Sequence, residues 1–256
     1  MKRMLAVFAH PDDEAFGPGG MLANYGQRED VEIHLLTATR GEAGMWDEES
    51  RLKVKGERLK IKNKEEIKIH HIRVEELKES AKVLGIKKVE FLDYVDGTLC
   101  NAIYHELAGK ITKKMEEFNP DVIVTHDRLG WSGHLDHCAV SMITTYAFLH
   151  STIGKKLYYY CITKEYRDPT DDNYFIYFPE GYDKRDVTTR IEYTPYWDRR
   201  IEAMQKHQSQ KHDVDSIVKW LKTKPKIDTF ILQRYRGITA KFPESDLFEG
   251  IISNSD

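Results

Sequence analysis

The chain has 256 residues, with 39 Lys and Arg against 42 Asp and Glu and a formal net charge of −3. This length can bury a sizeable core, and the charge balance argues against nucleic acid or an anionic membrane surface as the partner. No apolar run approaches the roughly 20 residues of a membrane helix, and three widely spaced cysteines without a CxxC pair favour reduced thiols and a cytoplasmic location.

Short runs of β-branched, aromatic and aliphatic residues predict five strands. They are MLAVFA (4–9), VEIHLLTAT (31–39), VEFLD (89–93), DVIVTHD (121–127) and KLYYYCIT (156–163). Apolar residues at three- and four-residue spacing predict helices over 19–25, 74–84, 104–118 and 135–149. Apolar strands that alternate with helices are typical of a parallel sheet covered on both faces. The sequence therefore predicts an α/β fold with a Rossmann-like, mostly parallel sheet flanked by helices, in a single domain over residues 1–256.

Three segments lie outside this alternation. Residues from about 51 to 69 are rich in Lys, Arg and Glu and predict a charged insertion, which is either a solvated excursion or a lid or oligomer contact. Residues from about 211 to 256 are expected to form a C-terminal extension. The stretch 165–186, rich in Tyr, Asp and Pro, is a candidate wall of a pocket.

Ionisable residues follow the predicted strands directly. The strand exits contain His10, Asp12, Asp13 and Glu14, then Arg40 and Glu42, then Asp93 and Asp96, and finally Asp127 with GWSGHLDH. In open parallel sheets, ligands bind outside the carboxyl ends of the strands. The sequence therefore predicts one site shared by the four exits.

The first exit, AHPDDEAFGPGG, has a spacing that suits a metal. Pro11 keeps His10 extended and sets the turn that follows. Residues three apart lie on the same side of a helical turn, so His10 and Asp13 can converge on one point while Asp12 points elsewhere. The glycines of GPGG are expected to clear the mouth of the site and let the backbone approach a ligand.

The fourth exit supplies the complement. His134 and His137 are again three apart at a predicted helix start, Asp136 lies between them, and Ser132 could cap the helix. Catalytic zinc sites typically have three protein ligands and an open position. The two exits therefore predict a site for Zn²⁺, with Fe²⁺ or another divalent metal as an alternative.

Amide hydrolysis is a reaction that such a site can perform. A bound zinc ion lowers the pKa of its water to about 7 and polarises a carbonyl group. Asp12, beside the metal, could take the proton of the water. An imidazolium at His134 could stabilise the developing oxyanion, and Asp136 could hold that ring and favour its charge.

Several stretches together resemble the LmbE/PIG-L family of metal-dependent N-deacetylases, which includes N-acetylglucosaminyl-phosphatidylinositol, mycothiol-pathway and bacillithiol-pathway deacetylases. They are AHPDDE, GGMLANY, TATRGEAG, residues 73–99, GHLDHCA and KHQSQ, within about 4–210. The resemblance implies His10, Asp13 and His137 as metal ligands, Asp12 as general base, His134 as second catalytic group with Asp136 holding its ring, and Arg73 and Asp96 as contacts to sugar hydroxyls. Arg40, with Glu42 as an ion-pair partner, is a further candidate for the substrate site.

The resemblance implies a zinc-dependent hydrolase that removes the N-acetyl group from an N-acetylglucosamine-type sugar or sugar conjugate. An amidase acting on a thiol-sugar conjugate or another N-acyl amide is the alternative. A non-haem iron oxygenase, which shares a two-histidine, one-carboxylate ligand set, and a non-catalytic metal-binding protein represent other classes. GPGG is not GxGxxG, which argues against dinucleotide binding. A homo-oligomer is left open.

Some residues keep two interpretations. His207 could close the pocket or serve as a solvated or capping residue, and Trp46 and Trp131 could stack on a sugar or pack in the fold. The remaining histidines are expected to be structural or surface residues. They are His34, His70, His71, His105, His126, His150 and His212.

Overall fold

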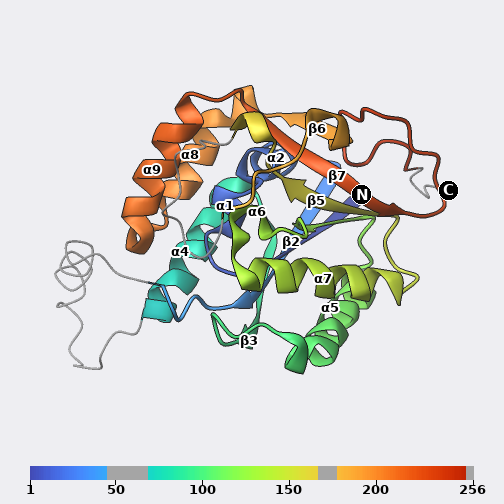
Figure 1. Ribbon diagram of the computed structural model, residues 1–256, viewed down its shortest axis with the longest axis horizontal. Helices are drawn as coiled ribbons and strands as arrows, with labels where there is room; N and C mark the ends of the chain where they lie inside the picture. Colours follow the sequence, from blue (N-terminus) through green and yellow to red (C-terminus); the bar gives the residue numbers. More distant parts are fainter. Residues whose placement is uncertain (45–68, 167–177, 252–256) are drawn as a thin grey trace.

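A seven-stranded sheet forms the centre of the computed structural model, which describes residues 1–44, 69–166 and 178–251 (Figure 1). The strands are β1 (Lys2–Phe8), β2 (Val31–Thr39), β3 (Lys88–Tyr94), β4 (Val122–His126), β5 (Lys156–Cys161), β6 (Thr189–Glu192) and β7 (Ile227–Tyr235). Their order in the sheet is β3-β2-β1-β4-β5-β7-β6. The pairs among β1 to β5 are parallel, whereas β7 runs antiparallel to β5 and β6. The fold is the predicted α/β class with a mostly parallel sheet.

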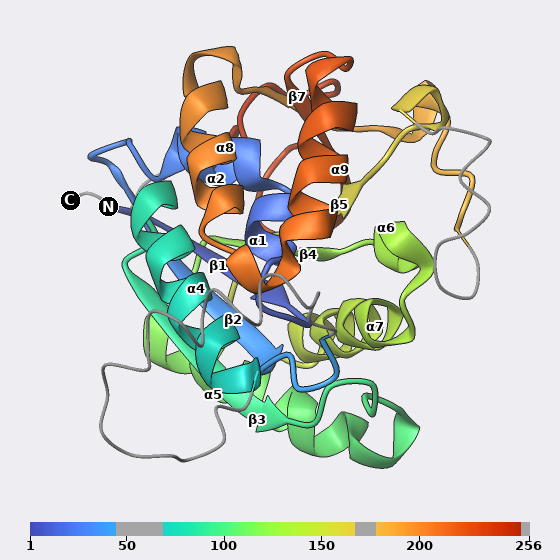
Figure 2. The ribbon, with the colours of Figure 1, turned by 90° about the vertical axis from the view of Figure 1, so that its left-hand side faces the viewer.

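Helices cover both faces of the sheet (Figures 1 and 2). One face carries α1 (Asp13–Phe16), α2 (Gly19–Tyr25), α4 (Ile69–Leu84), α8 (Trp197–Gln205) and α9 (Lys211–Lys222), and the other carries α5 (Tyr104–Phe118) and α7 (Leu135–Leu149). Shorter helices are α6 (Gly130–Gly133) and the 3-10 turns Asn101–Ile103, Lys164–Tyr166, Lys184–Asp186, Thr194–Tyr196 and Gln208–Gln210. None of the helices in the described ranges has both the length and the apolar character needed to cross a membrane.

Strand β1 shows why the apolar runs predict this fold. Successive strand side chains point to opposite faces, so Met4 and Phe8 pack against the α2, α4 and α8 side while Leu5 and Val7 pack against α5 and α7. All four side chains are almost fully buried. A strand buried on both faces has no polar alternation, and it therefore reads as one continuous hydrophobic run.

The five predicted strands and four predicted helices are confirmed with small displacements of their ends, and α4 begins at Ile69 instead of Val74. The elements β6, β7, α8 and α9 were not predicted. The segment expected as a C-terminal extension contains α9 and β7, and β7 lies inside the sheet between β5 and β6. The charged segment of about 51–69 falls almost entirely outside the described residues, and so does Trp46.

The glycines of GPGG pack against protein, and the expectation that they clear the mouth of the site is wrong. A Cβ atom at Gly20 would lie 2.2 Å from ring carbons of Tyr193, and one at Gly17 would lie 2.7 Å from the carbonyl oxygen of Asp13. Neither glycine lines the site cavity. The bare backbone instead lets the chain after β6 approach α2 closely.

Candidate metal and catalytic site

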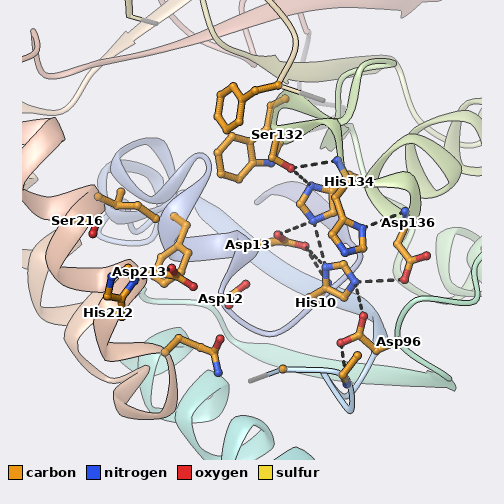
Figure 3. Close-up of a pocket in the computed structure, with 18 of the residues that line it drawn as sticks. His10, Asp12, Asp13, Asp96, Ser132, His134, Asp136, His212, Asp213 and Ser216 are labelled. Carbon is orange, nitrogen blue, oxygen red and sulfur yellow. Dashed lines mark hydrogen bonds and ion pairs between the residues drawn. The ribbon is translucent and has the colours of Figure 1, made fainter. Parts of the chain in front are cut away.

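The carboxyl ends of β1 and β4 bring the three predicted metal ligands together, and Figure 3 shows His10 and Asp13 side by side in the cavity. His10 follows β1, Asp13 begins α1, and His137 lies in the first turn of α7. Nε2 of His137 lies 3.1 Å from Nδ1 of His10 and 3.1 Å from Oδ1 of Asp13, and Nδ1 of His10 lies 3.8 Å from Oδ2 of Asp13. Ligand atoms around a tetrahedral zinc ion are about 3.3 Å apart at bond lengths of about 2.0–2.1 Å. The distances from Nε2 of His137 to His10 and to Asp13 therefore suit such an ion, whereas the 3.8 Å distance from His10 is to the other oxygen of Asp13.

Hydrogen bonds behind these ligands fix which atoms face the centre. Nδ1 of His137 donates to the carbonyl oxygen of Gly130 at 3.2 Å, which leaves Nε2 of this ring with a free lone pair. Oδ2 of Asp13 accepts from the backbone N–H groups of Ala9 and His10, at 3.1 and 2.7 Å. Oδ1 of Asp13 is thus the oxygen directed at His137.

Ser132 supports His137, and the expectation that it caps α7 is wrong. The N-cap residue of α7 is His134, whose Nδ1 accepts from the backbone N–H of Asp136 at 3.1 Å. The hydroxyl of Ser132 donates to the carbonyl oxygen of Gly130 and lies 3.0 Å from Nδ1 of His137. A contact of this kind orients a metal-binding imidazole.

The carboxylate of Asp136 contacts His10, a partner that the sequence did not predict for it. Oδ2 of Asp136 lies 3.2 Å from Nε2 of His10, and Oδ1 of Asp96 lies 3.0 Å from the same nitrogen. Asp136 also accepts from the backbone N–H groups of Gly97 and Leu99. Burial disfavours a charged imidazole, but hydrogen bonds to Asp136 and Asp96 raise the pKa of His10 to about 10. The cluster is therefore rich in buried negative charge, which a bound cation would balance.

His134 lies beside His10, with 4.6 Å between the ring centres. A backbone N–H can only donate, so the bond from Asp136 to Nδ1 places the ring proton of His134 on Nε2. Burial and the neighbouring charges of His10 and His137 lower the pKa of His134 to about 4. The structure thus favours a neutral imidazole at this position, where an imidazolium was expected.

Asp12 lies next to the ligands and is held by a buried arginine. Nη2 of Arg73 donates to Oδ2 of Asp12 at 2.8 Å and to the carbonyl oxygen of Pro11 at 2.6 Å. Burial raises the pKa of Asp12, Arg73 lowers it and Asp13 raises it, with a result of about 7. The φ angle of Asp12 is 112°, which is rare outside glycine and is typical of strain at functional sites.

A buried network supports the backbone of Asp12. The N–H of Asp12 donates to Oε2 of Glu14 at 3.0 Å. Oε1 of Glu14 accepts from the hydroxyl of Ser80 at 2.5 Å and lies 2.7 Å from Nε2 of His207. His207 is completely buried and lies outside the cavity lining. Burial alone would lower the pKa of His207, but the charge of Glu14 raises it. The structure therefore supports neither of the two interpretations of this histidine.

Arg40 lies outside the site, in contrast to the other predicted substrate residues. Its Nε donates to Asp93, which takes the place of Glu42 as the ion-pair partner, and Glu42 accepts from the backbone N–H of Asp96. Arg73 and Asp96 line the cavity, whereas Arg40 does not. The side chain of Arg40 packs over the ring of Phe91, with 4.8 Å from its guanidinium carbon to the ring centre.

His126, expected to be structural or a surface residue, lies against the metal ligands. Its Nε2 is 3.3 Å from Oδ2 of Asp13, and its ring stacks on His137 with 4.1 Å between centres. Burial and the charge of His137 lower its pKa to about 3, so the ring is neutral. The position of His126 at the end of β4 is the feature that indicates a role in the site. Strand β4 pairs with β1 so that Thr125 lies opposite Val7, which brings the residues after both strands together.

The site opens into a cavity of about 710 Å³. Its charged end contains His10, Asp12, Asp13, Arg73, Asp96, His134, Asp136 and His137. The opposite side is formed by the end of β5, the 3-10 turn after it, and α9 (Figure 3). Tyr166 and Phe178, which flank the undescribed residues 167–177 of the predicted wall, both line the cavity.

Residues 5–148 match the family model described as PIG-L, GlcNAc-PI de-N-acetylase. The chain is 32% identical to mycothiol S-conjugate amidase of Streptomyces coelicolor over 57% of this chain and 51% of that protein, so it spans about half of the length of that relative. It is 28% identical to 1D-myo-inositol 2-acetamido-2-deoxy-α-D-glucopyranoside deacetylase of Thermobifida fusca over 82% of this chain and 83% of that protein.

The fold is also found among solved structures. The crystal structure of the 4-carboxy-2-hydroxymuconate hydratase GalB of Pseudomonas putida is similar with a TM-score of 0.66, at 18% identity, over 94% of this chain and 100% of that chain. At this level of identity the similarity concerns the fold alone, and one fold hosts many reactions. The family model covers more than half of the residues, and by this match the chain belongs to the PIG-L family.

Proposed function

We propose that this protein is a zinc-dependent hydrolase that removes the N-acetyl group from an N-acetylglucosamine-type substrate. The observation that carries the proposal is the convergence of His10, Asp13 and His137, with the carboxyl group of Asp12 beside them in the same cavity. The PIG-L family match and the similarity to a deacetylase of an acetamido sugar support the substrate class.

In this proposal, Nδ1 of His10, Oδ1 of Asp13 and Nε2 of His137 hold the metal ion. Zinc supplies Lewis acidity, which activates water and polarises an amide carbonyl. The same two-histidine, one-carboxylate donor set also accepts Fe²⁺. Asp136 and Asp96 accept the Nε2 proton of His10 and so keep Nδ1 of that ring directed at the centre.

Two groups of this chain carry the proton and charge transfers. Asp12 accepts the proton of the attacking water and delivers it to the departing amine, a role typically worth about 10²–10⁴ in rate. His134 donates its Nε2–H to the oxygen on which negative charge develops, and such a donor needs no positive charge of its own. Arg73 holds Asp12 in place through the 2.8 Å contact.

Arg73 and Asp96 are the proposed contacts to sugar hydroxyls. Both are buried at the charged end of the cavity, and together they offer donors and acceptors to one face of a sugar. Arg40 has no place in this proposal because its guanidinium pairs with Asp93 outside the cavity.

The experiment is an assay for free amine and acetate. The protein is prepared anaerobically, loaded separately with Zn²⁺ and Fe²⁺, and incubated with N-acetylglucosamine and its simple glycosides. We expect equal amounts of primary amine and acetate, with loss of both after chelation. A protein with full metal content that releases no amine from any of these amides would refute the proposal.

An amidase acting on a thiol-sugar conjugate is the second candidate, and the 32% identity to mycothiol S-conjugate amidase favours it. The amide bond, the donor set and the general base would be the same in both reactions. Adding a cysteinyl-glucosamine S-conjugate to the assay separates the two: cleavage of the conjugate alone would identify an amidase of this type.

A further inference from the structure

The cavity has a second side that the proposed reaction does not use. Six apolar or aromatic side chains of the cavity lining form a surface that we call the apolar wall. They are Trp131, Ile162, Tyr166, Phe178, Ile217 and Trp220. One of them, Trp131, stacks on His137 with 5.9 Å between ring centres. Figure 3 shows α9, with His212, Asp213 and Ser216, facing the histidine cluster across this space. None of the six carries a formal charge, so the wall itself suits an uncharged group, although the polar side chains of Gln210, His212, Asp213 and Ser216 line the cavity beside it.

The wall is held in a fixed arrangement. Nε1 of Trp220 donates to the carbonyl oxygen of Tyr166 at 3.0 Å, and the hydroxyl of Tyr166 donates to the carbonyl oxygen of Pro225 at 2.7 Å. The rings of Tyr166 and Trp220 are 6.1 Å apart in an edge-to-face arrangement. Because these polar atoms are satisfied by backbone groups, the rings can present carbon to a ligand without leaving a buried donor unpaired.

Among the described residues, the wall is also only partly covered by other protein atoms. Five of its six members are half-buried, and Ile162 alone is buried, with 6% of its surface exposed. Aromatic and aliphatic surface that faces a cavity remains hydrated until a ligand covers it, and covering it is favourable in proportion to its area. This makes the wall a preformed surface for an apolar group.

The size of the cavity indicates what that group is attached to. Pockets of about 300–1,000 Å³ are typical of ligands of drug size, and this cavity of about 710 Å³ falls within that range. A single sugar held by Arg73 and Asp96 at the charged end would leave the wall in contact with water. A substrate that fills both sides therefore carries a polar amide-bearing sugar and a hydrophobic group.

We propose that the substrate is an N-acylated amino sugar with a hydrophobic substituent, aromatic or alkyl, which binds to the apolar wall. The inference rests on the proposed function and specifies its substrate class. The substituent is either the aglycone of a glycoside or an N-acyl chain longer than acetyl, since both present the same chemistry to the wall. Five of the six wall residues follow position 148, beyond the part matched by the family model.

The test compares matched substrates with the zinc-loaded protein. One arm uses methyl, hexyl and phenyl N-acetylglucosaminides, and the other uses methyl glycosides with N-acetyl and N-hexanoyl groups. We expect kcat/KM to rise tenfold or more with the apolar group in one arm, because each buried methylene contributes severalfold. Equal kcat/KM values throughout both arms would overturn the inference.

Two variants connect the preference to the wall. Trp220→Ala and Ile217→Ser should reduce the ratio of kcat/KM between the preferred substrate and its methyl or acetyl counterpart to near one. Trp197→Ala is the matched control, since Trp197 lies in α8 outside the cavity lining and should leave that ratio unchanged. Thermal unfolding of each variant verifies the fold. An unchanged ratio in both folded wall variants would contradict the inference.

A binding measurement separates this inference from the proposed function. Calorimetry with methyl and phenyl glucosaminides, and with methyl N-acetyl- and N-hexanoyl-glucosaminides, compares affinities without requiring turnover. If no amide is cleaved but a ligand with an apolar group binds tenfold more tightly than its counterpart, the hydrolase assignment fails and the apolar subsite stands. If amides are cleaved but neither the affinity nor kcat/KM changes with the apolar group, the apolar subsite is refuted and the hydrolase assignment stands.

Discussion

The part of the chain that matches the family model and the part that follows it contribute differently to the site. Residues 5–148 contain the proposed metal ligands, Asp12 and His134, and these residues follow the ends of β1 and β4. Residues after 148 contribute most of the apolar wall. In the two proposals, the first region supplies the chemistry and the contacts to the sugar through Arg73 and Asp96, and the second region supplies most of the surface for the hydrophobic substituent.

The second region also supports the first from behind. The fully buried Arg200 of α8 donates to the carbonyl oxygens of Phe16 and Gly17 and pairs with Asp228 of β7 at 3.0 Å. His207 contacts Glu14 of α1. Elements far along the chain therefore hold the turn that contains Asp12 and Asp13. The two regions have separate proposed roles, but they contact each other in the structure.

The largest expected effect is loss of the metal. His137→Ala removes the nitrogen closest to both other ligand atoms, so we expect the bound metal to fall well below one ion per chain and amine release to be abolished. Elemental analysis after gel filtration measures the metal. His150→Ala, which alters an exposed histidine after α7, is the control. Full metal content in the His137 variant would contradict its assignment as a ligand.

The next effect is loss of the base with the metal retained. Asp12→Asn keeps the shape of the side chain but removes the proton acceptor, so we expect kcat to fall by about 10²–10⁴ at unchanged metal content. Initial rates of amine release and elemental analysis on one preparation test this. Asp93→Asn is a matched control because Asp93 pairs with Arg40 outside the cavity. Activity within tenfold of the parent in the Asp12 variant would remove the assignment.

A smaller effect is expected at the contact between the two regions. His207→Ala leaves Ser80 and the N–H of Asp12 as the partners of the buried Glu14 carboxylate among the described residues, so the strained backbone of Asp12 loses support. Groups that hold a catalytic residue in place typically change activity by about 10–100-fold. We expect kcat to fall in this range with KM nearly unchanged, as steady-state kinetics would measure.

Two further variants separate positioning from general damage. His207→Gln retains a donor toward Glu14 and should recover part of the lost kcat. Ser209→Ala removes a 2.6 Å hydrogen bond to Glu76 in the same turn without touching Glu14, and it should leave kcat within about threefold of the parent. Equal losses in the Ser209 and His207 variants would mean that the turn acts only through stability.

The first region could largely be predicted from sequence because its signals are local. In a parallel sheet, the residues after each strand meet at one edge, and the three-residue spacing of His10 and Asp13 and of His134 and His137 determines which side chains share a direction. The partner of Asp136 could not be predicted in this way. Its carboxylate is held by two backbone N–H groups of the loop after β3, and only the folded position of that loop directs it to His10.

The remaining differences have the same origin in tertiary packing. His126 ends an apolar strand and looks like any core histidine, and only the pairing of β4 with β1 places it beside Asp13. The glycines of GPGG suggest an open mouth, yet Gly20 is bare because Tyr193 packs on it. In both cases a distant segment decides the role of the residue.

The smallest expected effect on turnover lies in the second region, away from the cavity. The hydroxyl of Tyr158 donates to Glu244, which also pairs with Lys156 at 2.6 Å, and these buried groups join β5 to the chain after β7. Tyr158→Phe removes the hydrogen bond to Glu244 and the one that the hydroxyl accepts from Nζ of Lys156 at 3.0 Å. Since a hydrogen bond to a charged group is typically worth about 1.5–3 kcal/mol, the unfolding free energy should fall by at least this amount. We expect the midpoint of thermal unfolding to fall by several degrees while kcat/KM stays the same, as calorimetry and the amine assay would measure. A fall in kcat/KM at full metal content would show that the contacts of Tyr158 and Lys156 with Glu244 also position the catalytic residues. The second region would then contribute to the reaction itself as well as to the apolar wall.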